Sequence, residues 1–561
     1  MDRSWLKHYP PGIPAEIDPS IYPSLKALLE HALATNAAET AFINMGTRLS
    51  YAQLDLLSAA FASWLQQKAG LVPGDRVALM MPNVLQYAVA LYGVLRAGMV
   101  VVNTNPLYTA HELEHQLKDS GAKVIVILEN FAQVLQAVLP RTQIEHVLVT
   151  GVGDMLSFPR GFIVNLVLRR VRKQVPPYDL PKALRFKNAL GAGLGLTVTP
   201  VEVGPEDPAF LQYTGGTTGV SKGAVLTHGN MVANVLQAGA FLITGASSTR
   251  GTTIVTALPL YHIFSLTVNA LLFAHAGGCN LLITNPRDFP GFVKELSKHR
   301  FHYVSGVNTL FNALMHTPGF ERIDFSTLRR TLGGGMAVQA AVAQRWKQMT
   351  GCILSQGWGL TETSPVVTTN PPDVDFNGSV GVPLPSTDVS IRDDAGVFLG
   401  TGEIGEICVK GPQVMRGYWN RPDETAKVMF GDWLRTGDIG YMDEQGFVFI
   451  CDRKKDMILV SGFNVYPNEV EDVAITHPGI LECAAVAQAD ERSGEVVALF
   501  VVKKDPALTA ESVIEHCRKD LTGYKVPRHV YFRSELPKTN VGKILRRALR
   551  DELRNSGGPL G

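Results

Sequence analysis

From residue 76 onward, short apolar runs alternate with stretches of helical periodicity, and this alternation limits the fold of the 561-residue chain more than any other feature. The early runs predict strands at 76–81, 99–102 and 123–128, with helices at 85–96 and 110–119. The pattern returns later, with strands predicted at 253–258, 280–284 and 303–307. Strands separated by helices of this length are typical of βαβ units. The sequence therefore predicts an α/β fold with parallel sheets covered by helices on both faces.

Two changes in texture divide the rest of the chain. Between about residues 378 and 442, short β-type runs are separated by Gly, Pro and Asp, which indicates a small, mostly β subdomain. A charged run at 452–456 (Asp-Arg-Lys-Lys-Asp) then marks a boundary. The segment after it has strands predicted at 482–488 and 496–502 and a helix at 510–520. We therefore expect a large α/β domain over 1–451 that contains the β subdomain, and a small α+β domain over 457–561.

The composition excludes several classes of protein. Apolar residues make up 46% of the chain and charged residues 18%, which is an ordinary globular balance. The 52 basic and 51 acidic residues leave a formal net charge of +1, so no overall field attracts nucleic acid and none is expected as a partner. The six cysteines form no C-x-x-C pair, and no apolar run reaches the roughly 18 residues of a membrane-spanning helix. We expect a cytoplasmic chain that stays in solution or contacts a membrane surface.

One segment, residues 158–177, departs from this even charge. It contains no acidic residue, and its basic residues are Arg160, Arg169, Arg170, Arg172 and Lys173. Its apolar residues include Phe162, Ile163, Leu166, Val167 and Val171. A basic amphipathic helix of this kind can lie in an anionic lipid interface, where each cation contributes ~1 kcal/mol. Two interpretations stay open: a membrane-surface helix, or a solvated helical insertion whose apolar side packs on the domain.

The most specific local signal is a glycine- and threonine-rich run, Tyr213-Thr214-Gly215-Gly216-Thr217-Thr218-Gly219-Val220-Ser221-Lys222-Gly223. Its glycines allow a tight turn that aims backbone N–H groups at one point, while the hydroxyls and the Lys222 ammonium add donors for an anion. The spacing is not that of a Walker A loop, and the nearby 191–195 lacks the third glycine of a Rossmann fingerprint. The alternative is a plain surface turn, but so dense a run of small, hydroxyl and basic residues favours a phosphate-binding loop.

This run resembles the AMP-binding signature of the adenylate-forming family, which includes acyl-CoA synthetases, coumarate-CoA ligases, firefly luciferase and peptide-synthetase adenylation domains. Further motifs of the family occur in the same order at 356–363, 433–438, 452–467 and 537–547. The resemblance covers about residues 25–550, and the stretch 432–469 is most similar to bacterial long-chain fatty acyl-CoA synthetases. It implies an AMP-binding N-terminal domain that is hinged at 452–456 to a mobile C-terminal domain.

The resemblance also implies which residues hold the nucleotide. Beyond the run 213–223, the ATP-binding residues would be Gly334, Gly335, Gly357, Trp358, Gly359, Thr361, Asp438, Arg453 and Lys543. Trp358 would flank the adenine, although Tyr is commoner at that position, and Asp438 would accept hydrogen bonds from the ribose hydroxyls. Glu362 and Thr214 would hold Mg²⁺, which accepts a carboxylate together with phosphate oxygens and waters.

The implied reaction has two steps. A carboxylate that is already ionised at neutral pH attacks the α-phosphorus of ATP and expels pyrophosphate, so no general base is required. By the resemblance, Lys543 is the adenylation lysine, and the expected catalytic group consists of Lys543, Lys222, Thr214 and His262. Because Lys543 serves this step alone, the C-terminal domain is expected to turn about Lys455 before the CoA thiolate attacks the acyl carbonyl and releases AMP.

The acyl pocket is expected beside His262, with Gly306 and Asn308 on the opposite wall. The expected protein is a long-chain fatty acid–CoA ligase that uses ATP, CoA and a fatty acid, with Mg²⁺ as cofactor. Aryl or medium-chain acids are the alternative substrates, and a non-catalytic, membrane-docking lipid-binding protein is the alternative from a different class. The expectation includes a cytoplasmic location, with or without contact with the inner face of the cell membrane, and leaves a homodimer open.

A second motif points to a different chemistry. His111-Glu112-Leu113-Glu114-His115 matches the H-E-x-x-H signature of zinc proteases. No third zinc ligand is evident, and Thr109 with Glu112 also fits a capping box that begins a helix. We therefore favour the capping interpretation.

Overall fold

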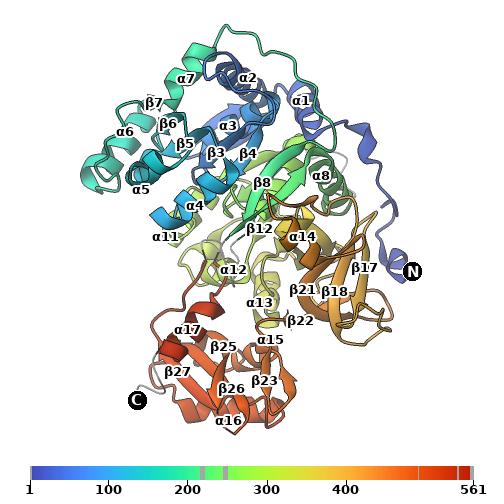
Figure 1. Cartoon of the computed structure of the whole chain (residues 1–561). Coiled ribbons are helices and arrows are strands. Elements are labelled where there is room, and N and C mark those ends of the chain that lie inside the picture. Colours follow the sequence, from blue (N-terminus) through green and yellow to red (C-terminus); the bar gives the residue numbers. More distant parts are fainter. Residues whose placement is uncertain (1–2, 215–220, 244–249, 491, 540–541, 556–561) are drawn as a thin grey trace.

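The computed structural model describes residues 3–214, 221–243, 250–490, 492–539 and 542–555. Figure 1 shows two large sheets surrounded by helices, a smaller antiparallel sheet beside them, and a C-terminal part that lies below all three. These four sheets define the places where chain segments far apart in sequence come together.

The first sheet has eight strands in the order β19-β9-β8-β4-β3-β5-β6-β7. Its central strands, β4 (Val100–Asn103), β3 (Arg76–Met80) and β5 (Val124–Leu128), run parallel. Helices α3 (Leu85–Arg96) and α4 (Ala110–Ser120) connect them. The predicted parallel βαβ arrangement is confirmed, and α3 has the predicted bounds.

Strand β3 explains why this sheet is covered on both faces. Val77 and Leu79 pack in one hydrophobic cluster, whereas Ala78 and Met80 pack in another. Successive side chains of a strand point to opposite faces, so each face of the sheet belongs to its own core. An uninterrupted apolar run, rather than an alternation of apolar and polar residues, is what such a strand requires.

The second sheet has nine strands in the order β16-β15-β14-β13-β12-β10-β11-β1-β2. Its predicted strands are found as β10 (Thr253–Thr256), β11 (Cys279–Leu282) and β12 (Tyr303–Gly306). β10 lies between the other two and runs parallel to both. The sheet continues in parallel through β13 (Arg330–Gly333) to β14 (Leu354–Gly359). The motif 356–363 therefore begins within β14 and continues past its end.

The third sheet is antiparallel and lies in the region where a β subdomain was predicted. Its strands are β17 (Asp388–Arg392), β18 (Gly405–Lys410), β20 (Met429–Phe430), β21 (Trp433–Met442) and β22 (Val448–Arg453). β22 lies beyond residue 442, where the β subdomain was predicted to end, and it includes the first two residues of the predicted hinge. The domain boundaries themselves stay predictions.

In the residues that the structure describes, the C-terminal part combines a sheet with three helices. Its strands are β23 (Ile458–Val460), β24 (Phe463–Val465), β25 (Ile480–Asp490), β26 (Gly494–Lys503) and β27 (His529–Arg533). Its helices are α15 (Pro467–Ala474), α16 (Ala510–Asp520) and α17 (Arg546–Asn555). The predicted α+β character is confirmed, and α16 has the predicted bounds.

Candidate active site

One cavity of about 1080 Å³ lies where the three N-terminal sheets and the C-terminal part meet. β8 (Pro208–Thr214) and β9 (Lys222–Thr227) reach it from the first sheet, β14 from the second and β21 and β22 from the third. The predicted site residues on its walls are Tyr213, Thr214, Lys222, His262, Gly334, Gly335, Gly357, Trp358, Gly359, Thr361, Glu362, Arg453, Lys455 and Lys543. The fold therefore gathers residues from six separate stretches of sequence around a cavity large enough for a bound organic ligand.

The glycine- and threonine-rich run begins at the end of β8 and finishes at the start of β9. These two strands are antiparallel, and Thr214 of β8 is paired with Lys222 of β9. Gly215, Gly216, Thr217, Thr218, Gly219 and Val220 lie outside the described residues. The Ser221 carbonyl accepts a hydrogen bond from His115 Nε2 at 2.9 Å. The Tyr213 ring lies close to Gly223, because a Cβ at that position would be only 3.1 Å from it. The paired strands thus present Thr214 and Lys222 at the cavity.

Lys222 is held by an acidic and an aromatic partner. Its ammonium forms an ion pair with Glu424 of α14 (Pro422–Val428) and lies 5.0 Å above the centre of the Tyr418 ring. Tyr213 has its own partner, because its hydroxyl donates to Asp119 at 2.7 Å. An incoming anion would compete with Glu424 for the Lys222 ammonium.

Glu362 lies on the same wall, in a short 3₁₀ turn at Thr361–Thr363. Its Oε1 accepts a hydrogen bond of 2.6 Å from the Tyr418 hydroxyl. Burial and the neighbouring Glu362 carboxylate raise the pKa of Tyr418 well above its usual value, so this phenol remains a donor. Within the described residues, no group of three or more His, Cys, Asp or Glu side chains is placed to hold a metal ion. A single oriented carboxylate beside a phosphate site fits Mg²⁺, which keeps most of its ligands from phosphate and water.

Asp438 is the centre of a buried polar group behind the cavity wall. Its side chain is about 3% exposed, Oδ2 accepts from Trp358 Nε1 at 2.8 Å, and Oδ1 pairs with Arg453 Nε at 2.5 Å. The register of β21 and β22 places Asp438 directly opposite Arg453, which explains the second contact. The indole N–H of Trp358 therefore orients the Asp438 carboxylate. A carboxylate has about four acceptor positions, so two remain for further donors.

Lys543 reaches the cavity from the C-terminal part. The preceding residue, Gly542, has a φ of +86°, and its carbonyl accepts from Thr309 Oγ1 of α12 (Asn308–Met315) at 3.1 Å. A Cβ on Gly542 would lie only 2.8 Å from that oxygen, so a residue without a side chain is needed here. This contact seats the Lys543 turn against the N-terminal part. Burial, followed by the positive charge of Arg453, lowers the pKa of Lys543 to about 8.

This lowered pKa makes a prediction about pH. We expect kcat/KM for ATP in the adenylation step to fall as pH rises through about 8, because the charged ammonium is the form that binds phosphate and its fraction declines above the pKa. Lys543→Arg should lose this fall, since an arginine stays protonated. The measurement is a pH profile of pyrophosphate exchange at low ATP for both enzymes. A wild-type profile that stays flat up to about pH 10, as for an ordinary lysine, would contradict the assignment.

His262 borders the apolar end of the cavity, just before α9 (Ile263–Ser265). Its Nδ1 accepts from the Phe264 N–H at 3.3 Å, and burial together with Lys543 lowers its pKa to about 4, so the ring is neutral at pH 7. The cavity lining does not include Gly306 or Asn308. Asn308 instead exchanges two hydrogen bonds with Gln339, at 2.9 and 3.0 Å. The role of these two residues in an acyl pocket stays a prediction.

Two cavity residues have no signal in the sequence. Tyr418 orients Glu362 and lies under Lys222, and Glu424 neutralises Lys222, yet both belong to a stretch without periodicity or a recognised motif. A hydrogen bond between positions 56 residues apart can be found only once β19 (Gly417–Tyr418) is paired with β9.

The H-E-x-x-H sequence lies on α4, where the capping interpretation is confirmed. Thr109 Oγ1 accepts from the Glu112 N–H at 3.3 Å, and Glu112 Oε2 accepts from the Thr109 N–H at 2.8 Å. This reciprocal pair satisfies N–H groups that the first turn of a helix leaves without partners. The motif is therefore explained by helix formation.

Comparison with known proteins agrees with this geometry. A long-chain-fatty-acid--CoA ligase from Salmonella typhimurium is 57% identical over 559 residues, which covers 99% of either chain. The crystal structure of ATP-bound MatB from Rhodopseudomonas palustris has a TM-score of 0.81 at 28% identity, covering 95% of this chain and 100% of that one. The anthranilate CoA ligase AuaEII with bound anthranoyl-AMP has a TM-score of 0.86 at 24% identity over 96% of this chain and 100% of its own, which shows a shared fold.

The family itself follows from sequence models. The model described as AMP-binding enzyme matches residues 29–419, and the model described as AMP-binding enzyme C-terminal domain matches residues 469–543. The first match alone spans more than half of the chain, and the second contains Lys543. The resemblance predicted from the ordered motifs is confirmed: this chain belongs to the family of AMP-binding enzymes.

Proposed function

We propose that the chain is a long-chain fatty acid–CoA ligase, which activates a fatty acid as its adenylate and transfers the acyl group to CoA. The observation that carries the proposal is the single cavity in which Lys222, Glu362 and Lys543 converge from three distant stretches of sequence. The full-length similarity to a relative that is named a long-chain-fatty-acid--CoA ligase supports the substrate class. ATP and CoA are the cosubstrates that such a ligase requires.

In the first step the chain contributes charge and position rather than a base. The fatty acid carboxylate is ionised at pH 7, so no base has to remove a proton from it. His262, with its lowered pKa, would be a neutral neighbour of that carboxylate. Lys222 and Lys543, which both line the cavity, would neutralise phosphate oxygens as pyrophosphate leaves, and Asp438, held by Trp358, would bind the ribose. Catalysis would come from holding these charges in a site that is already organised.

Mg²⁺ belongs to the proposal as the cofactor. Glu362, oriented by Tyr418, and Thr214 would hold it, and the ion would supply a compact positive charge against the phosphate oxygens. Both residues lie on the wall that carries Lys222, which is where phosphates are expected.

In the second step Lys543 has no task, because the acyl carbonyl reacts with a thiolate and no pyrophosphate is formed. We propose that the C-terminal domain turns about Lys455, which lines the cavity next to Arg453, and that this movement withdraws Lys543. The hinge at 452–456 and the domain bounds on either side of it belong to this proposal.

The experiment that tests the substrate class measures thioester formation with a panel of acids. Hexadecanoate should give the highest kcat/KM, because each methylene buried in the enzyme contributes ~0.8 kcal/mol. Octanoate and 4-hydroxycinnamate represent the medium-chain and aryl alternatives. A higher kcat/KM for either of them would replace the long-chain assignment while keeping the ligase chemistry.

We propose in addition that the segment 158–177 contacts an anionic membrane. This segment forms α6 (Arg160–Leu166) and one π-helical turn (Val167–Val171) at the outer edge of the molecule (Figure 1). It exposes a group of large apolar side chains: Phe158, Phe162, Ile163, Leu166 and Val171. Phe158 is 90% exposed, and the exposed cations Arg170, Arg172 and Lys173 follow in the chain. Apolar and basic groups on one exposed segment match the chemistry of an anionic lipid surface.

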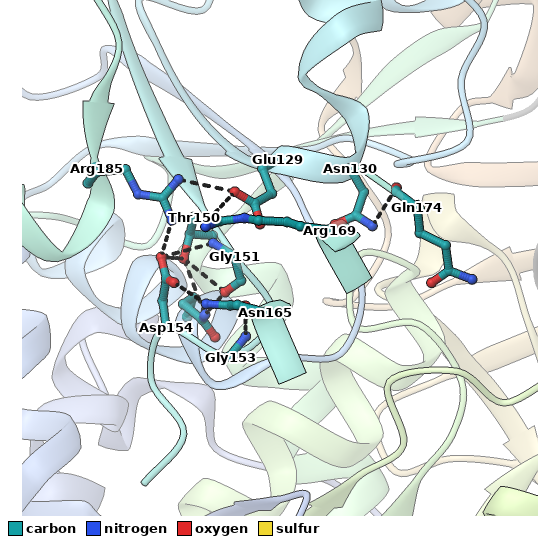
Figure 2. Close-up of polar contacts among 11 residues, drawn as sticks. Glu129, Asn130, Thr150, Gly151, Gly153, Asp154, Asn165, Arg169, Gln174 and Arg185 are labelled. Atoms are coloured by element: carbon teal, nitrogen blue, oxygen red, sulfur yellow. Dashed lines mark hydrogen bonds and ion pairs between the residues drawn. The ribbon is translucent and has the colours of Figure 1, made fainter. Parts of the chain in front are cut away.

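The inner side of the same segment is tied down by polar contacts, as Figure 2 shows. Arg169 donates to both oxygens of the buried Glu129, at 2.9 and 2.6 Å, and Asn165 Nδ2 donates to Asp154 at 2.8 Å. Arg185 bridges these two carboxylates. Arg169 therefore serves as an anchor and Arg160 donates to the Met45 carbonyl, whereas Arg170, Arg172 and Lys173 are exposed cations. Among the described residues, no helix has the length and apolar character needed to cross a bilayer.

Vesicle binding tests the membrane proposal. Neutralising Arg170, Arg172 and Lys173 together to Gln should weaken sedimentation with phosphatidylglycerol vesicles about 100-fold, since each cation contributes ~1 kcal/mol. Phe162→Ser with Leu166→Ser should also weaken it. Leu107→Ser with Val72→Ser, two exposed apolar residues elsewhere, is the matched control. Unchanged binding by the first two variants would remove the proposal.

A homodimer stays a prediction that awaits measurement of mass in solution.

A further inference from the structure

Asp452 is a buried carboxylate at the end of β22 that binds groups from both sides of the hinge. Its side chain is 1% exposed. Oδ1 accepts from the Arg453 N–H at 2.7 Å and from Arg546 Nη1 at 2.9 Å, while Oδ2 accepts from the Asn468 N–H at 2.8 Å. Arg453 belongs to the third sheet, whereas Asn468 and Arg546 belong to the C-terminal part. Asp452 is therefore a direct polar link between the two parts.

Arg546 is the partner that gives this link its geometry. It is the first residue of α17, and its guanidinium also binds Glu471 through Nε at 2.9 Å and Nη2 at 2.7 Å. Glu471 and Asn468 both lie on α15, which packs against β22 (Figure 1). A guanidinium presents its donors in a fixed planar fork, so satisfying two carboxylates at once fixes its position.

The position of Arg546 determines the position of Lys543. Only two residues separate them, and one of these, Leu545, donates its N–H to the Pro537 carbonyl at 2.8 Å. Lys543 itself exchanges two hydrogen bonds with Thr539, at 2.7 and 3.1 Å. The next turn of α17 adds a further tie, because Arg550 pairs with Asp456 at 2.8 Å and donates to the Lys455 carbonyl at 3.2 Å. The base of the Lys543 turn is thus held on the hinge itself.

We propose that Asp452 and Arg546 are positioning residues that hold Lys543 in the nucleotide cavity for adenylation and separate before thioester formation. The inference rests on the proposed function and extends it to residues outside the cavity. If the C-terminal domain turns about Lys455, Asp452 stays with β22 while Arg546 and Asn468 move away. The Asp452 contacts with them are therefore specific to the arrangement in which Lys543 meets the nucleotide. Contacts made in one of two states set the balance between those states.

The consequence is a split between the two half-reactions. Asp452→Asn keeps the shape of the side chain but removes the charge and one acceptor, which lowers the population of the Lys543-inward state. Pyrophosphate exchange should fall roughly 10- to 100-fold, as expected for lost hydrogen bonds to a buried charge. Thioester formation from supplied acyl-adenylate and CoA should stay equal to wild type or become faster. Arg546→Gln should show the same split, and Arg546→Lys should recover part of the exchange.

The control is an ion pair that lies wholly inside the C-terminal part. Lys525 pairs with Glu469 at 2.6 Å, and Lys525→Gln should leave both half-reactions within about twofold of wild type. Arg546→Gln leaves Glu471 and Asp452 without their cation and can unfold the domain, so a thermal melt accompanies each variant. Asp452→Asn keeps the Arg546–Glu471 pair and remains informative.

The outcomes separate this inference from the proposed function. Suppose that wild-type enzyme exchanges pyrophosphate. If a folded Asp452→Asn variant then loses both half-reactions to the same extent, or retains both, the positioning role is wrong and the ligase assignment stands. If wild-type enzyme exchanges no pyrophosphate with any acid, the proposed function fails first.

Discussion

Replacing Lys543 by alanine is expected to abolish adenylation while sparing thioester formation from supplied acyl-adenylate. Lys543 lines the same cavity as Lys222 and Glu362, and it reaches that cavity from the C-terminal part. Removing a preorganised positive charge from such a site costs about 100- to 1,000-fold in rate. The second half-reaction forms no pyrophosphate and needs no such charge. The measurement compares pyrophosphate exchange with thioester release for the same purified variant.

Lys538 provides the matched control for this prediction. It lies five residues before Lys543, but its ammonium pairs with Glu482 of β25 at 2.6 Å within the C-terminal part. Lys538→Ala removes the same charge from the same region and should affect the two half-reactions alike, by only a few-fold. Equal loss of both half-reactions in Lys543→Ala would mean that Lys543 serves the fold or the thioester step, against the assignment.

Glu362→Gln is expected to lower adenylation about 100-fold and to raise the Mg²⁺ concentration needed for half-maximal rate. The amide keeps the size of the side chain and can still accept from Tyr418, so the loss reports the negative charge. The measurement is a Mg²⁺ titration of pyrophosphate exchange, together with the Mg²⁺ dependence of ATP binding by calorimetry.

Tyr418→Phe refines this result, because it removes the hydrogen bond that orients Glu362 and leaves the charge in place. It should give an intermediate shift in the Mg²⁺ requirement. An unchanged Mg²⁺ requirement in Glu362→Gln would show that this carboxylate is not a ligand, and the metal role would then have to be sought elsewhere on the cavity wall.

The sheets could be predicted because their signals are local. Val77, Ala78, Leu79 and Met80 form an uninterrupted apolar run, and such a run between two helical stretches already specifies a parallel strand that is covered on both faces. Lys222 could be predicted to lie near Thr214 for a similar reason. The two residues are only eight positions apart in the sequence, so they cannot lie far apart in the fold.

Contacts between distant segments could not be predicted. The bond from Trp358 to Asp438 joins residues 80 positions apart, and it depends on how β21 of the third sheet lies beside β14 of the second. Arg169 was expected among the membrane-facing cations, yet its guanidinium pairs with the buried Glu129, 40 positions away in the sequence, although its side chain is partly exposed. The sequence around Trp358 or Arg169 is the same whether the side chain contacts solvent, a ligand or a buried partner. Only the packing of the elements decides between these roles.

Isotope exchange between radiolabelled pyrophosphate and ATP, without CoA, tests the central claim most directly. The account predicts that purified enzyme transfers label into ATP when hexadecanoate and Mg²⁺ are both present, and that omitting either reactant stops the exchange. If no organic acid supports exchange by folded enzyme, the cavity around Lys222, Glu362 and Lys543 does not form acyl-adenylates, and the account is contradicted.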